Sequence, residues 1–200
     1  MYVVGYIDDD TELFDDYISR LQDRDINLMI APDGSMEEVK LWIVDNNIKC
    51  MIVDHRLKNR YDFYGTDLVA YLKTELVGLP CIILTSYSDD SINEKLVEKN
   101  NIVERDVMSS NDFDSFCDTI KQCTEVFDRR MESYKSQYKE LFVKKRNNEI
   151  TIGEEEKLLD LFKILRAYRE VDDVPAEMLK TTLSNQLDSV LGKLDDLLEK

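Results

Sequence analysis

Short apolar runs alternate with helical patterns over the first half of the chain. The apolar runs lie at residues 3–7, 26–30, 50–53, 81–84 and 102–103. Between them, at 13–21, 35–46, 66–76 and 89–98, apolar residues recur three and four positions apart, as they do on one face of a helix. Strands that alternate with helices form a parallel sheet with helices on both faces. The pattern therefore predicts an α/β fold with a five-stranded, doubly wound parallel sheet.

A different pattern starts near residue 111, where one apolar stripe continues for about four heptads. Its steps alternate between four and three residues, and neither Gly nor Pro interrupts it. The stripe consists of Phe113, Cys117, Ile120, Thr124, Phe127, Met131, Tyr134, Tyr138 and Leu141. It predicts a fifth helix that is longer than the sheet requires. Two arrangements stay open: the extended helix forms a coiled-coil dimer, which we favour, or it packs back against the C-terminal segment of its own chain.

Two further helices are expected after this long helix. Thr151 and Glu154 fit a capping box, which opens a helix that continues to Tyr168. Pro175 suits the first turn of a last helix, whose apolar stripe covers 179–197. We therefore expect an α/β domain at 1–126 and an all-helical extension at 127–200.

Composition indicates a soluble globular protein, with 43% hydrophobic and 34% charged residues among 200. No apolar run approaches the roughly 18 residues of a membrane span, and the chain begins without the pattern of a secretory signal. We expect a cytoplasmic protein. The four cysteines form no CxxC pair, which argues against a disulfide framework and a zinc site. The only histidine, His55, is expected to be a solvated loop residue.

The net charge of −16 is unevenly distributed. Residues 1–126 contain 26 acidic and 12 basic residues, whereas 127–200 contain 16 and 14. An acidic first domain disfavours nucleic acid and anionic membranes as partners. Seven basic residues at 129–146 fit either a contact surface for such partners or, more commonly, a solvated helix face. We predict no strong binding to nucleic acid or membranes.

Polar residues with chemical potential follow the predicted strands. Asp8 and Asp9 follow the first strand, Asp54 the third, Thr85 the fourth and Arg105 the fifth. Ligands of open α/β sheets bind at this edge, outside the carboxyl ends of the strands. Three converging carboxylates repel one another unless a cation lies among them, and Mg²⁺ prefers such oxygen ligands. With a hydroxyl and a fixed positive charge nearby, the set indicates phosphoryl transfer to a carboxylate.

Four motifs appear in order over about 125 residues: IDDDTEL at 7–13, VDHRL at 53–57, GTDL at 65–68 and ILTS at 83–86. In these motifs the sequence resembles the receiver domain of bacterial response regulators, the chemotaxis-type fold. The resemblance implies a flavodoxin-like sheet and phosphorylation of Asp54 by a histidine kinase or a small phosphodonor. It also implies Mg²⁺ held by Asp9, Asp54 and the main-chain carbonyl of Arg56, with Asp8 in support. Thr85 would be the switch hydroxyl.

The sequence departs from this family at several positions. The family usually has Lys where Arg105 stands, and an aromatic residue near Ile102. The loop between Asp54 and Gly65 looks longer than usual and is rich in aromatic and basic residues, so we expect it to contact a partner or shield the site.

Two bulky residues lie two positions after the implied phosphoryl-transfer residues: Arg56 after Asp54, and Tyr87 after Thr85. Both would obstruct a water molecule that attacks the acyl phosphate. We therefore predict slow dephosphorylation.

We expect a signalling switch, not an enzyme, that passes its phosphorylation state to a helical module for homodimerisation or partner binding. One alternative keeps the fold without phosphorylation: a pseudo-receiver that binds partners constitutively. Another, ranked low, is a haloacid-dehalogenase-type phosphatase with its nucleophile loop at 8–12. That family requires Thr or Val where Glu12 stands, and this reading leaves Asp54 without a role.

Overall fold

The computed structural model describes residues 1–58, 60–86 and 101–172, except for the side chain of Leu13. The chain divides into two compact units, Met1–Arg130 and Met131–Lys200. The predicted helices at 89–98 and 179–197, and Tyr87, lie outside the described residues. Within the described ranges, no helix is long and apolar enough to cross a membrane.

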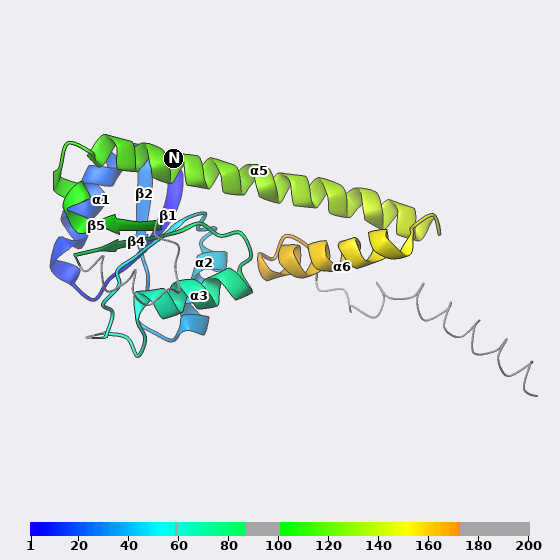
Figure 1. The fold of residues 1–200 in the computed structure, drawn as a ribbon, viewed down its shortest axis with the longest axis horizontal. Helices are drawn as coiled ribbons and strands as arrows, with labels where there is room; N and C mark the ends of the chain where they lie inside the picture. Colours follow the sequence, from blue (N-terminus) through cyan, green and yellow to red (C-terminus); the bar gives the residue numbers. More distant parts are fainter. Residues whose placement is uncertain (59, 87–100, 173–200) are drawn as a thin grey trace, which may run out of the picture. The chain divides into compact units, whose positions relative to one another are not determined.

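The first unit contains one parallel sheet of five strands in the order β2-β1-β3-β4-β5 (Figure 1). This is the strand order of flavodoxin-like, doubly wound folds, and it confirms the predicted fold class. The strands are β1 (Tyr2–Ile7), β2 (Ile26–Ile30), β3 (Met51–Val53), β4 (Cys81–Thr85) and β5 (Ile102–Glu104). All four pairings between neighbours are parallel. The carboxyl ends of β1, β3, β4 and β5 therefore share one edge of the sheet.

Helices cover both faces of this sheet. Among the described residues, the helices of the first unit are η1 (Thr11–Leu13), α1 (Phe14–Gln22), α2 (Met36–Asp45), α3 (Gly65–Glu75), η3 (Arg105–Ser109) and the start of α5 (Phe113–Arg146). Tyr17 of α1 and Phe116 of α5 share one core with the strand residues Tyr6 and Ile52. Helices α2 and α3 lie on the opposite side of the sheet (Figure 1). The spacing of Ser35 and Glu38 in the sequence fits a capping box, and this box is present at the start of α2.

Helix α5 has 34 residues and confirms the long helix predicted from the heptad stripe. In the second unit, its residues Tyr134, Tyr138 and Leu141 pack against Leu158 and Phe162 of α6 (Ile152–Ala167). Thus α6 of the same chain covers this part of the stripe, and the structure has the packed-back arrangement rather than the coiled coil that we favoured. The turn between the helices includes Asn148 at φ 58°, a left-handed conformation that Asn tolerates. Homodimerisation stays a prediction.

Charged side chains also join α5 to the segment that follows it. Lys144 Nζ lies 2.7 Å from Glu154, and Lys145 Nζ lies 2.9 Å from the buried Glu155. Lys135 pairs with Glu170 just beyond α6, at 2.9 Å. Three lysines of the basic run at 129–146 are thus occupied within the second unit, which weakens the case for a nucleic-acid surface.

Candidate functional site

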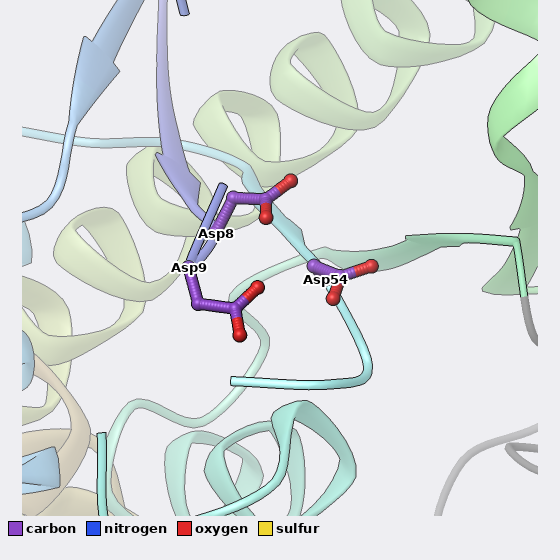
Figure 2. Close-up of side chains that lie close together, drawn as sticks. All are labelled: Asp8, Asp9 and Asp54. Carbon is purple, nitrogen blue, oxygen red and sulfur yellow. The ribbon is translucent and has the colours of Figure 1, made fainter. Parts of the chain in front are cut away.

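Three aspartates meet at the carboxyl edge of the sheet. The parallel register pairs Ile7 with Val53, so the residues that follow them, Asp8 and Asp54, lie side by side. One carboxylate oxygen from each of Asp8, Asp9 and Asp54 lies within 4.8 Å of the others. Figure 2 shows the three side chains close together. Asp8 and Asp54 are buried, whereas Asp9 is partly exposed. The structure therefore brings together the three acids that the sequence placed at separate strand ends.

These acids line a pocket of about 500 Å³. Its lining residues are Asp8, Asp9, Asp10, Asp54, Arg56, Ser86 and Arg105. They come from the ends of four strands, as expected for a ligand site of an open α/β sheet.

Arg105 supplies the positive charge next to the acids. It is the first residue after β5, and its Nη2 lies 2.8 Å from Asp8 Oδ2 and 2.6 Å from Asp54 Oδ1. Burial alone would lower the pKa of Arg105, but Tyr6, Asp8 and Asp54 together raise it. The guanidinium therefore stays charged and joins two buried carboxylates, at the position where the sequence predicted it.

Asp8 accepts hydrogen bonds on both oxygens. The Tyr6 hydroxyl donates to Oδ2, and the Asp10 N–H donates to Oδ1 at 2.9 Å. Burial raises the pKa of Asp8, and the bonds from Tyr6 and Asp10 and the charge of Arg105 oppose this. Tyr6 was not among the residues predicted to lie at the site. The two-residue period of a strand could have indicated Tyr6, because it points residues 6 and 8 to the same side of β1.

The carboxylate of Asp54 is fixed by two donors. Arg105 binds Oδ1, and the Arg56 N–H donates to Oδ2 at 2.8 Å. Gly65 is the first residue of α3. A Cβ on this residue would lie 1.9 Å from the Asp54 carbonyl oxygen. Only a residue without a side chain fits there, which explains the glycine of the GTDL motif.

The remaining predicted residues lie at or near the same edge. Thr85 ends β4 and is fully buried. Among the described residues at this strand end, Ser86, which follows Thr85, lines the pocket. Arg56 lines the pocket and its side chain is exposed. Ile102 is partly buried in β5 and pairs with Ile83 of β4. The switch role of Thr85 and the metal-ligand role of the Arg56 carbonyl stay predictions.

The loop after Asp54 is more buried than expected. His55 is 2% exposed and stacks on Tyr64 with ring centroids 5.5 Å apart, so the prediction of a solvated histidine was wrong. Tyr61 and Phe63 are also buried, and the Tyr61 hydroxyl donates to the carbonyl of Pro32 at 3.4 Å. The aromatic residues of the loop fold inward because each large ring gains by leaving water. These buried rings pack within the first unit and are not displayed to a partner.

The residues of the pocket fit a hard divalent cation. Asp8, Asp9 and Asp54 offer oxygen ligands within a few ångströms of one another, and Arg105 balances only one of their three negative charges. Mg²⁺ binds oxygen ligands of this kind and retains several of its waters. The acidic cluster is therefore suited to Mg²⁺.

Comparisons with known proteins identify the fold. No family model and no curated protein matches the sequence. Among solved structures, the signal receiver domain of an HD domain-containing protein from Pseudomonas fluorescens Pf-5 matches with a TM-score of 0.52 and 14% identity, over 66% of this chain and 92% of that one. NtrX from Brucella abortus in complex with ADP matches with a TM-score of 0.52 and 15% identity, over 66% of this chain and 29% of that one. The chain therefore has the fold of response-regulator receiver domains, as its motifs predicted, followed by a helical region.

Proposed function

We propose that this protein is a response-regulator-type signalling switch that accepts a phosphoryl group on Asp54 in a Mg²⁺-dependent reaction. The observation that supports this most is the position of Asp54. It is buried at the base of the pocket, with oxygens of Asp8 and Asp9 within 4.8 Å and the Arg105 guanidinium at 2.6 Å. In this role the protein is an acceptor of phosphoryl groups and does not turn over a substrate of its own.

The proposed reaction is an in-line displacement. An oxygen of Asp54 attacks the phosphorus of a phosphohistidine on a partner kinase, or of a small acyl phosphate. The new P–O bond forms as the bond to the leaving group breaks, and the product is an acyl phosphate. The Arg56 N–H holds the carboxylate in one orientation, and Arg105 provides positive charge for the phosphoryl oxygens.

Asp9, Asp54 and the Arg56 carbonyl would hold Mg²⁺, with Asp8 in support. The bound ion would neutralise charge on the transferred phosphoryl group. The Thr85 hydroxyl would respond to the phosphoryl group as the switch. The exposed Arg56 side chain lines the pocket, where it would obstruct attacking water, and this supports slow dephosphorylation. A measured acyl-phosphate half-life of seconds would contradict that part of the proposal.

The second unit would carry the output. Helix α5 contributes residues both to the core of the first unit and to the hairpin with α6. One helix would therefore transmit a change at the sheet to the hairpin. We expect the hairpin to bind a protein partner or a second copy of the chain when Asp54 is phosphorylated.

Beryllofluoride, which mimics a phosphoryl group on aspartate, tests this proposal. Titration with Mg²⁺, followed by calorimetry and light scattering, should show Mg²⁺-dependent binding and a change in oligomeric state. Asp54→Asn should abolish the binding. Asp10→Asn is the matched control, because Asp10 lines the same pocket and caps η1, and Asn is an equally good cap. The control should still bind beryllofluoride.

The second candidate is a pseudo-receiver, and Arg105 is the observation that favours it. Its guanidinium already bridges Asp8 and Asp54, which compensates part of their charge without a metal. Failure of the wild-type chain to bind beryllofluoride would select this candidate. The phosphatase reading predicts turnover of an aryl phosphate, and its absence would remove that reading.

A further inference from the structure

Tyr6 connects the acidic site to the hydrophobic core. The residue lies on β1 and is 1% exposed, and its hydroxyl donates a hydrogen bond to Asp8 Oδ2. Its ring packs edge-on against Phe14, with centroids 5.7 Å apart, and against Tyr17 at 5.8 Å. Because two aromatic neighbours fix the ring, the position of the hydroxyl is also fixed.

The hydroxyl of Tyr6 is a buried polar group in a largely apolar core. A phenylalanine at this position would bury the same ring without the cost of a polar group. A buried hydroxyl needs a partner, and here the partner is an aspartate of the candidate metal site. A bond to an ionised carboxylate is also roughly twice as strong as one between neutral groups.

The donors around Asp8 hold the carboxylate in one orientation. Oδ2 accepts a hydrogen bond from Tyr6 and forms an ion pair with Arg105 Nη2 at 2.8 Å, and Oδ1 accepts from the Asp10 N–H. Arg105 follows β5, and β3 and β4 separate this strand from β1 in the sheet. Tyr6 therefore anchors Asp8 from its own strand, independently of the strand that carries the arginine.

We propose that Tyr6 is a positioning residue: its hydroxyl orients Asp8 so that the carboxylates of Asp8, Asp9 and Asp54 are preorganised for a divalent cation. This inference rests on the proposed magnesium site. Groups that orient metal ligands from outside typically contribute about 10-fold to 100-fold in metal affinity. Asp8 is a supporting member of the set, so the lower value is expected here.

The test measures Mg²⁺ affinity of the full-length chain by titration calorimetry. Tyr6→Phe removes only the hydroxyl and should weaken Mg²⁺ binding about 10-fold. Tyr17→Phe is the matched control, because it makes the same chemical change in the same aromatic cluster without touching Asp8. Its affinity should stay at the wild-type value.

A double-variant cycle separates positioning from a general effect on folding. If Tyr6 acts through Asp8, Tyr6→Phe should have no further effect on Mg²⁺ affinity once Asp8→Asn is present. The melting temperatures of the metal-free variants, measured in parallel, report folding alone. Equal Mg²⁺ affinity of wild type and Tyr6→Phe, or an undiminished effect in the Asp8→Asn background, overturns the role of Tyr6. A wild-type chain that binds no Mg²⁺ overturns the metal site itself, and the role of Tyr6 with it.

Discussion

Arg105→Met removes the positive charge that bridges Asp8 and Asp54. The guanidinium is 17% exposed and lies within 2.8 Å of an oxygen of each acid, whose side chains are 1% and 6% exposed. Methionine keeps much of the length of the arginine side chain and removes its charge and donors. Two buried carboxylates then face each other without this partner, and we expect the metal-free protein to lose stability.

The size of the loss follows from the burial of the pair. Removing one partner of a buried ion pair costs about 3–5 kcal/mol, and the partial exposure of Arg105 favours the lower end, about 3 kcal/mol. A domain of this size loses about 2–4 °C of melting temperature per kcal/mol. We therefore expect the melting temperature of Arg105→Met to fall by about 6–12 °C without Mg²⁺.

The loss should also depend on pH. Burial already raises the pKa of Asp8, and Arg105 is one of the groups that oppose this rise. Without Arg105 the pKa of Asp8 rises further, so the folded variant binds a proton at pH values where the unfolded chain has released it. Its unfolding free energy then decreases as pH rises above the ordinary aspartate range. The deficit relative to wild type should be larger at about pH 8 than at about pH 5.

Thermal unfolding followed by circular dichroism, with and without Mg²⁺ at both pH values, measures these effects. Arg105→Lys retains the charge and should lose less. Arg129→Met is the control for loss of a positive charge, because this side chain is 81% exposed and such surface changes stay within about 0.5 kcal/mol. A melting temperature for Arg105→Met within about 2 °C of wild type, or an equal deficit at both pH values, would refute the role given to Arg105.

Two further predictions concern packing around the site and in the hairpin. Gly65→Ala places a Cβ 1.9 Å from the Asp54 carbonyl oxygen, so it should cost about 1–3 kcal/mol and weaken beryllofluoride binding. Gly153→Ala in α6 is the control, because a Cβ there meets no atom within 4 Å, and it should change neither stability nor beryllofluoride binding. A tolerated Gly65→Ala would show that α3 can move away from Asp54. Phe162→Ala removes a buried ring from the α5–α6 core and should cost that unit about 3–5 kcal/mol. Hydrogen exchange should show faster opening of α6 with unchanged protection of β1 and β3. An equal loss of protection in both units would mean that they unfold together.

The sequence by itself determined the order of strands and helices and which residues end the strands. Both follow from local rules: apolar period, capping boxes at Ser35 and Thr151, and the geometry of parallel strands. Asp54 and Arg105 are far apart in the chain, yet strand order alone predicted that they share an edge of the sheet, and they are 2.6 Å apart.

Only the tertiary structure decided which partners the side chains find. The heptad stripe showed that one face of α5 needs covering, but periodicity does not identify the cover, which is α6 of the same chain. Likewise, nothing local distinguishes a buried His55 from a solvated one, because its burial depends on how the loop returns to place Tyr64 against it. Tyr6 looked like an ordinary core residue until the fold placed its hydroxyl on Asp8. Local pattern fixes which groups a chain presents, and packing between distant segments decides what each group contacts.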